Sequence, residues 1–254
     1  MIDGLAAAAA ALRRARHIMV FTGAGISAES GIPTFRDRLT GLWARHNPQR
    51  LETTKAFREN PALVWGRYLW RRQRVLQAQP NAAHRAITRL ADSGRQITVI
   101  TQNLDDLHER AGSQGVVHLH GSLITPKCFA CHRAAALSSV EQSVSQEGEF
   151  VEPPRCSHCN GRLRPGVVWF GEDLPTRTWK AAAQPARNCE VLLSIGTSGV
   201  VMPGASLPDL ALAGGAFVIH INPIDVSMDE PRELMLIGKA GLVLPTLLER
   251  TLAN

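Results

Sequence analysis

The chain has 254 residues, of which 44% are hydrophobic, and it carries a formal net charge of +6 at pH 7. A chain of this size can bury a substantial core, and because it has no run of 18 or more apolar residues, a transmembrane span is not expected. The charge comes from 24 arginines and four lysines that are scattered along the chain, so it suits acidic ligands such as a dinucleotide or an acidic acyl group better than nucleic acid.

The first 17 residues are basic, rich in alanine and free of glutamate. An organellar transit peptide can have this composition. The segment, however, runs directly into residues 18–21, an apolar run with the length of a strand. We therefore expect residues 1–17 to form the first helix of the domain and the protein to be cytoplasmic.

A glycine-rich loop follows this first predicted strand, in the segment FTGAGISAESGIPTFRD (residues 21–37). Gly23, Gly25 and Ala28 have the G-x-G-x-x-A spacing at which backbone amides can approach a pyrophosphate. A dehydrogenase would continue through a helix into a second strand, with an acidic residue about 20 positions later. Here Phe35 and Arg36 follow and no second strand is evident, so the loop indicates a nucleotide site of another kind.

Seven apolar runs have the length and composition of strands: residues 18–21, 97–101, 116–119, 167–170, 191–195, 217–221 and 242–244. Several end in small or polar residues, which predicts an α/β fold with a Rossmann-like, mostly parallel sheet and ligands at the carboxyl ends of its strands. Two segments interrupt this pattern and predict a smaller inserted domain, made of a helical module (38–80) and a zinc-binding module (123–165). The sheet domain is then expected to comprise residues 1–37, 81–122 and 166–254.

Two candidate polar side chains lie just after the predicted strand at 97–101. In TQNLDDLH (residues 101–108), Asn103 and Asp105 offer an amide and a carboxylate that suit a ribose and an amide ring substituent. In isolation, such residues are more typical of a helix N-cap and its first turn.

The segment HLHG contains His118 and His120, which would point to opposite faces of a strand. A lone histidine at the end of a strand usually has a structural role. Since Gly121 permits a close approach to His120, we nevertheless regard His120 as a candidate general base.

Four of the five cysteines form two C-x-x-C pairs, Cys128 with Cys131 and Cys156 with Cys159, with 24 residues between the pairs. Each pair can place two thiolates on one turn, and two pairs complete a tetrahedral zinc site. Disulfides or redox pairs are the alternative, but the sequence shows no secretory signal and a fifth cysteine would be left over. We predict one structural zinc without an open position for catalysis, and Cys189 as a small buried apolar residue.

Seven motifs taken in order resemble the sirtuin family: GAGISAESGIPTFRD, TQNLDDLHERAG, HLHGS, the paired C-x-x-C motifs, GVVWFGEDLP, GTSGVV and INP. The resemblance covers nearly the whole chain, from about residue 18 to residue 244. Sirtuins are NAD-dependent protein-lysine deacylases. The resemblance therefore implies that NAD is a co-substrate and is consumed, and that the loop after Gly25 closes over the nicotinamide ribose in place of a second strand.

The resemblance also implies roles for individual residues, which match anionic and polar groups of NAD. Contacts to the pyrophosphate and the neighbouring ribose are implied for Gly23, Ala24, Gly25, Phe35 and Arg36. The nicotinamide pocket is implied for Gln102, Asn103 and Asp105, and the adenosine side for Gly196, Thr197, Ser198, Asn222 and Ala240. Val168, Trp169 and Phe170 would pair as a strand with the substrate peptide.

In the mechanism that the resemblance implies, the acyl-lysine carbonyl oxygen attacks the ribose carbon and expels nicotinamide. His120 then deprotonates a ribose hydroxyl, which attacks the resulting imidate. Hydrolysis leaves free lysine and O-acyl-ADP-ribose. A pKa near neutrality suits His120 to this step, and Asn103 and Asp105 complete the expected catalytic set.

The identity of the acyl group depends on Tyr68 and Arg71, which stand three residues apart on a predicted helix and so share a face. A buried tyrosine hydroxyl and a guanidinium can bind a carboxylate by charge-assisted hydrogen bonds. An exposed basic helix is the alternative, because three further arginines lie nearby. This Y-x-x-R motif, together with Thr34, resembles the sirtuin class that removes succinyl and malonyl groups, and we favour that function.

Other functions stay open at this point: a plain protein deacetylase or an ADP-ribosyltransferase, or a non-catalytic module that senses NAD or ADP-ribose. A sensing module would not need His120, Asn103 and Asp105 together, so we expect an enzyme. The expected partners are acyl-lysine proteins or peptides, without a membrane or nucleic acid, and the protein is expected to be a monomer. His118 stands where relatives often carry Glu, and it should matter little if it faces away from the site.

Overall fold

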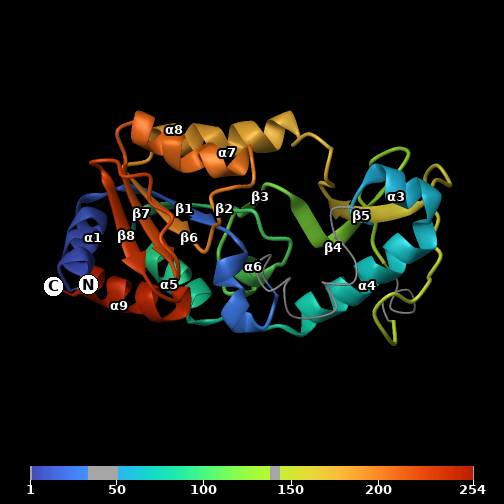
Figure 1. Ribbon diagram of the computed structural model, residues 1–254, viewed down its shortest axis with the longest axis horizontal. Coiled ribbons are helices and arrows are strands. Elements are labelled where there is room, and N and C mark those ends of the chain that lie inside the picture. Colours follow the sequence, from blue (N-terminus) through green and yellow to red (C-terminus); the bar gives the residue numbers. More distant parts are fainter. Residues whose placement is uncertain (1, 34–50, 138–143, 254) are drawn as a thin grey trace.

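The computed structural model describes residues 2–33, 51–137 and 144–253. Within these residues the main sheet has six parallel strands in the order β3-β2-β1-β6-β7-β8 (Figure 1). The strands are β1 (His17–Thr22), β2 (Gln96–Thr101), β3 (Val117–His118), β6 (Val191–Ile195), β7 (Phe217–Asn222) and β8 (Glu233–Ile237). The order reverses between β1 and β6, which is the arrangement of a doubly wound nucleotide-binding sheet.

Helices cover both faces of this sheet (Figure 1). One face carries α1 (Ile2–Arg14), α5 (Ala82–Ala91) and α9 (Ala240–Leu252), and the other carries α7 (Thr176–Asn188) and α8 (Leu207–Ala213). The short helix α6 (Leu107–Arg110) follows the loop after β2. The expected Rossmann-like α/β class is confirmed.

Every central residue of β1 is apolar because helices cover both faces of the sheet. Ile18 and Val20 pack against the α1–α5–α9 face, while Met19 and Phe21 pack against the α7–α8 face. Successive side chains of a strand point to opposite faces, and here both faces are covered by helices. All four side chains are therefore fully buried.

A smaller part of the molecule lies beyond the β3 edge of the sheet (Figure 1). It contains α3 (Thr54–Glu59), α4 (Pro61–Gln77) and an antiparallel pair of strands, β4 (Gly121–Cys128) and β5 (Leu163–Val167). Asn60 separates the two helices and accepts a hydrogen bond from the Leu63 amide, with Pro61 at the start of α4. This part has its own core, in which Phe57, Trp65 and Leu69 are buried.

The structure corrects two of the expected strands. Residues 242–244 belong to α9, because Leu244, Leu247 and Leu248 form one buried helical face against the sheet. The last strand is instead β8, which the sequence prediction missed. The predicted strand at 167–170 is also wrong: β5 ends at Val167, and the amide of Trp169 donates to the carboxylate of Glu172.

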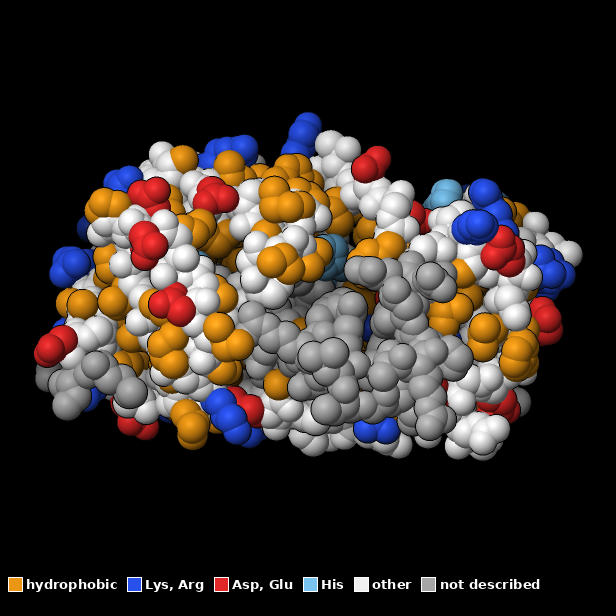
Figure 2. Space-filling view, viewed as in Figure 1, with side chains coloured by type: hydrophobic (Ala, Val, Ile, Leu, Met, Phe, Trp, Pro, Cys, Tyr) orange, Lys and Arg blue, Asp and Glu red, His pale blue; other side chains and the backbone are white. Residues whose placement is uncertain are grey.

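None of the helices in the described ranges is long and apolar enough to cross a membrane. On the face shown in Figure 2, the described Lys and Arg side chains are spread around the molecule and do not gather in one strip. On this face the distribution agrees with the scattering of arginine in the sequence.

Candidate functional site

The site lies where parallel strands end at the same level. Thr22 at the end of β1 pairs in register with Thr101 at the end of β2 and with Ile195 at the end of β6. The loops that follow these three strands therefore leave the sheet side by side. In a doubly wound sheet this edge, at the reversal of strand order, is where ligands bind.

Glycines allow the loops after β1 and β6 to touch. A Cβ atom on Gly23 would lie 2.8 Å from the Gly196 carbonyl oxygen, and one on Gly25 would lie 2.7 Å from the Gly196 Cα. Gly196 itself has a φ of +63°, which side chains disfavour. The result is close backbone packing between the two loops, which a side chain at any of these three positions would disturb.

Two amides of this loop bind backbone carbonyls at the end of β6 and in the loop after it. The Gly23 amide donates to the Ile195 carbonyl at 3.0 Å, and the Gly25 amide donates to the Gly196 carbonyl at 2.9 Å. A short 3-10 turn at Ala24–Ile26 holds the loop against β6. In this arrangement the glycines act through close backbone packing, and the contact of Gly23 and Gly25 with a pyrophosphate stays a prediction. Of the other expected contacts in this loop, Phe35 and Arg36, like Thr34, lie outside the described residues.

Asn103 and Asp105 are brought together by Ser27. The Asn103 amide donates to the Ser27 hydroxyl at 3.0 Å, and this hydroxyl donates to the Asp105 carboxylate at 3.0 Å. All three side chains are buried. Ser27 was not among the predicted site residues, although its place in the glycine-loop motif, two residues after Gly25, could have indicated it.

The charge state of Asp105 is set by opposing effects. Burial raises its pKa, whereas hydrogen bonds from the Leu107 amide and the Ser27 hydroxyl lower it. The effect of burial is the larger one, so the pKa of Asp105 lies above that of a carboxyl group in water. A buried carboxyl beside a carboxamide offers directed hydrogen bonds to a polar, uncharged group such as a ribose hydroxyl or an amide.

A second layer of hydroxyls supports Asn103. The amide N–H of Asn103 donates to the Thr101 hydroxyl at 3.0 Å, and the Thr22 hydroxyl donates to the same oxygen at 2.8 Å. His108 Nε2 lies 2.9 Å from the Thr22 oxygen, so it must be the protonated nitrogen that donates there. Burial lowers the pKa of His108 to about 3, which keeps the ring neutral.

His120 lies in a turn directly after β3 and is half-buried. Its Nδ1 is 3.1 Å from the Gln102 carbonyl, and its own carbonyl accepts the Val168 amide at 2.8 Å. The next residue, Gly121, has a φ of +78°, and a Cβ there would lie 2.2 Å from the Gly166 carbonyl. Burial lowers the pKa of His120, and the Gln102 carbonyl partly offsets this. A neutral imidazole with Nδ1–H bonded can accept a proton at Nε2.

His118 does not face away from the site. Its Nδ1 lies 3.1 Å from the Asn103 carbonyl, and its Nε2 lies 2.7 Å from the Glu109 carboxylate. Burial lowers the pKa of His118, but the hydrogen bond and charge of Glu109 outweigh this effect and raise it. His118 therefore contacts the backbone of Asn103. We expected it to matter little only if it faced away from the site, and it does not.

The residues expected on the adenosine side lie at the ends of β6 and β7. The Asn222 side chain donates to the Thr197 carbonyl at 3.1 Å, and the Thr197 hydroxyl lies 3.2 Å from Ser194. Ser198 is exposed, whereas Ala240 is buried at the start of α9. These contacts bring the expected residues to one edge and leave Ser198 open to solvent.

Tyr68 and Arg71 line one pocket on the smaller part of the molecule. Its lining combines polar and apolar side chains, among them Glu52, Arg67, Tyr68, Arg71, Val167 and Trp169. The Tyr68 side chain is buried, and its hydroxyl has no hydrogen-bond partner among the described residues. Burial raises the pKa of Tyr68, so the hydroxyl stays a neutral donor. Arg71 forms an ion pair with Glu52.

The expected peptide-binding residues border this pocket. Val168 donates its amide to His120, and Phe170 donates its amide to the Glu52 carbonyl at 3.0 Å. Trp169 is buried over the Arg164 guanidinium, 3.4 Å from the ring centroid, and Phe170 is 39% exposed. The three residues thus connect the histidine, the pocket and the surface.

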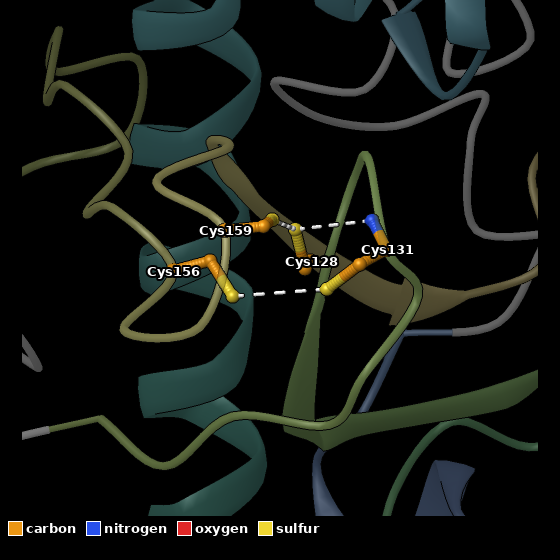
Figure 3. A group of neighbouring side chains, drawn as sticks. All are labelled: Cys128, Cys131, Cys156 and Cys159. Atoms are coloured by element: carbon orange, nitrogen blue, oxygen red, sulfur yellow. Dashed lines mark hydrogen bonds between the residues drawn. The ribbon is translucent and has the colours of Figure 1, made fainter.

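The four paired cysteines meet at the end of β4 and in the turn before β5 (Figure 3). Their sulfur atoms all lie within 4.8 Å of one another, with 3.4 Å between Cys128 and Cys159 and 3.8 Å between Cys131 and Cys156. A tetrahedral zinc with Zn–S bonds of about 2.3 Å places its sulfurs about 3.8 Å apart. The donor set therefore fits one structural zinc, as predicted.

The two cysteine turns share a local geometry. The residue after the second cysteine of each pair, His132 or Asn160, has a positive φ of 59° or 58°. The amides of Ala130 and Cys131 point at the Cys128 sulfur at 3.3 and 3.4 Å. Amides aimed at a sulfur favour its thiolate form, which is the form that binds a metal. The fifth cysteine, Cys189, is buried in the α7–α8 core as expected.

Comparisons with known proteins agree with this geometry. The family model described as the Sir2 family matches residues 23–203. A protein from Pseudomonas putida named NAD-dependent protein deacylase is 62% identical over 250 residues, covering 98% of this chain and 95% of that protein. A protein of the same type from Pseudomonas aeruginosa is 56% identical, covering 94% and 96% of the two chains.

Solved structures give the same result. A Sir2 homologue in complex with NAD is 40% identical, with a TM-score of 0.85 and coverage of 96% of this chain and 92% of that chain. A Sir2 protein bound to a myristoylated histone peptide is 36% identical, with a TM-score of 0.77 and coverage of 99% and 97%.

Proposed function

This chain belongs to the Sir2 family and is an NAD-dependent protein deacylase, and we propose that it removes the short acidic acyl groups malonyl and succinyl from lysine side chains. Acetyl groups are proposed as weaker substrates. The proposal rests on one observation, the presence of Tyr68 and Arg71 in a pocket that reaches the chain segment bonded to His120.

The path from the pocket to the base is short. Val167 lines the pocket, and the following residue, Val168, donates its amide to the His120 carbonyl. An acyl-lysine that enters between these residues would have its acyl chain in the pocket and its amide next to His120. Arg71 and the Tyr68 hydroxyl offer a cation and a neutral donor to a distal carboxylate, which acetyl-lysine lacks.

In the proposed reaction NAD supplies the ribose carbon that accepts the acyl oxygen. Asn103 and Asp105, joined by Ser27, would hold the nicotinamide end through polar hydrogen bonds. His120 would take a proton from a ribose hydroxyl at Nε2, because the Gln102 carbonyl occupies Nδ1–H. Exclusion of water by the buried surroundings strengthens these interactions.

The direct experiment is mass spectrometry of one peptide bearing acetyl-, malonyl-, succinyl- or myristoyl-lysine, incubated with the protein with and without NAD. We expect NAD-dependent release of all short acyl groups, with higher kcat/KM for malonyl and succinyl. A higher kcat/KM for acetyl or myristoyl would overturn the acidic-acyl proposal and leave the deacylase activity in place.

A further inference from the structure

The acyl pocket already contains a carboxylate of the protein. Glu52 lines the pocket together with Tyr68 and Arg71, and its carboxylate is hydrogen-bonded to the Arg71 guanidinium as an ion pair. Both side chains are largely buried, with exposed fractions of 20% for Glu52 and 22% for Arg71. An acyl carboxylate that approached Arg71 would thus meet a group of its own charge.

The fold fixes Glu52 in this position from both sides. Its carbonyl oxygen accepts the Phe170 amide at 3.0 Å, which ties it to the segment expected to bind the substrate peptide. The next residue, Thr53, is the N-cap of α3 and accepts a hydrogen bond from the Ala56 amide at 3.1 Å. These two hydrogen bonds restrain the backbone at Glu52.

Arg67, another arginine that lines the pocket, also has a carboxylate nearby. Arg67 lies one turn before Arg71 on α4, is buried, and pairs with Glu147 at 3.8 Å. The charge of Glu52 acts on Arg67 as well, although burial is the larger influence on that guanidinium and lowers its pKa. Among the described residues, Arg67 and Arg71 thus each have a carboxylate partner, Glu147 and Glu52 respectively.

Space leads to the same conclusion. The volume of the pocket is about 20 Å³, which is room for about one water molecule. Any acyl chain therefore needs the pocket to open, and a malonyl or succinyl carboxylate beside Arg71 additionally needs the Glu52 carboxylate to move away. Displacement would break the ion pair with Arg71 and form an equivalent one with the substrate, so much of the gain from a charge-assisted contact would be cancelled.

We propose that Glu52 is a specificity-determining residue, whose carboxylate competes with the distal carboxylate of an acidic acyl group for Arg71. The inference rests on the proposed acyl pocket and deepens it. Glu52 lowers the preference for malonyl and succinyl over acetyl below the level that Tyr68 and Arg71 alone would give. An acetyl group has no distal carboxylate to bind Arg71, so the turnover of acetyl-lysine is largely independent of Glu52.

The test compares Glu52→Gln with Glu59→Gln, whose glutamate is exposed on α3 and pairs only loosely with Lys55. In Glu52→Gln we expect kcat/KM for succinyl-lysine to rise about tenfold, mainly through KM, because the neutral amide no longer competes as an anion. The value for acetyl-lysine should stay within about twofold in both variants. An unchanged ratio of succinyl to acetyl activity, or equal losses on both peptides, would overturn the proposal.

A double-mutant cycle separates this inference from the proposed function. In an Arg71→Met background, the Glu52→Gln exchange should no longer favour succinyl-lysine. If Arg71→Met lowers the ratio but Glu52→Gln does not change it, the role of Glu52 is refuted and the acidic-acyl pocket stands. If neither variant changes the ratio, the pocket itself is refuted. Glu52→Asp keeps the charge and the cap at Thr53 but shortens the side chain, and it should raise the ratio less than Glu52→Gln does.

Discussion

The Nδ1 atom of His120 lies 3.1 Å from the carbonyl oxygen of Gln102, the residue next to Asn103. A carbonyl can only accept, so Nδ1 carries the proton and Nε2 has the free lone pair. The contact joins the loop after β3 to the loop after β2 and thereby restrains the orientation of the imidazole ring. The carbonyl of the same histidine binds Val168, so one residue connects the two halves of the site.

Replacement of His120 by Ala should abolish most turnover and preserve the fold. General-base catalysis contributes about 10²- to 10⁴-fold, so kcat for a succinyl or acetyl peptide should fall by that factor. The side chain is half-buried and makes one backbone contact, so the melting temperature should change little. Steady-state kinetics, thermal melts and calorimetric titration with ADP-ribose check this, and turnover close to that of the unmodified protein would remove His120 from the role of base.

The acid limb of the pH–rate profile should lie below pH 6.5. Burial lowers the pKa of His120 from its ordinary value of 6.5, and the base must be neutral to accept a proton. As the pH falls through this lowered pKa, the imidazole becomes protonated and kcat/KM falls; above it the rate is constant. A profile of kcat/KM from pH 5 to pH 8 measures the midpoint, and a midpoint clearly above 6.5 would contradict the assignment.

Replacement of Ser27 by Ala should impair catalysis and also lower the stability of the fold. The change removes the hydroxyl that joins Asn103 to Asp105 and leaves two buried polar groups without this shared partner. The loss of such a buried hydrogen bond costs about 1–3 kcal/mol, or about 5- to 150-fold in kcat/KM if it acts in the transition state. Replacement by Ala of Ser145, an exposed serine that contacts Glu149 on the smaller part of the molecule, is the control and should change kcat/KM by less than about threefold.

One zinc per chain should be bound by Cys128, Cys131, Cys156 and Cys159. Metal analysis by mass spectrometry should give a stoichiometry near one, and Cys156→Ser should lower it together with the melting temperature. Strong chelation should unfold this part of the chain, because binding of a structural zinc is part of the folding free energy. Cys189→Ser should keep the full metal content. Full activity at sub-stoichiometric metal would contradict the assignment.

Replacement of Arg71 by Met should reduce desuccinylation selectively. Loss of a charge-assisted contact in a partly desolvated pocket is worth about 2 kcal/mol, or about 30-fold in kcat/KM. Because Glu52 competes for Arg71, we expect a loss of about threefold on succinyl-lysine in the unmodified background and about 30-fold in a Glu52→Gln background, with acetyl-lysine affected much less. The neighbouring Arg72 is unsuitable as a control, because it is buried and its Nε donates to the Ile124 carbonyl at 3.4 Å, so its removal would disturb packing. Arg74, exposed three residues along the same helix, is the better control. An equal decrease of kcat/KM for the succinyl and acetyl peptides would indicate that Arg71 has a structural role only.

Much of this architecture is determined by local sequence patterns. The strands of the sheet centre are continuous apolar runs, because both faces are covered, and five of the seven predicted runs coincide with strands of the main sheet. The C-x-x-C spacing determines the cysteine turns, since each turn needs only four consecutive residues. The histidine–glycine pair also needs only local information, because Gly121 at a positive φ sits directly after His120.

Tertiary structure decided what depends on residues far apart in the chain. Only packing shows that Ser27 joins Asn103 to Asp105 across 76 and 78 positions, or that the amides of Gly23 and Gly25 are used by the loop after β6. The apolar run at 242–244 could equally be a strand or a helix, and burial against the sheet selected the helix. The pairing of Glu52 with Arg71 joins a loop to a helix, and no spacing rule predicts an ion pair between two separately folded segments.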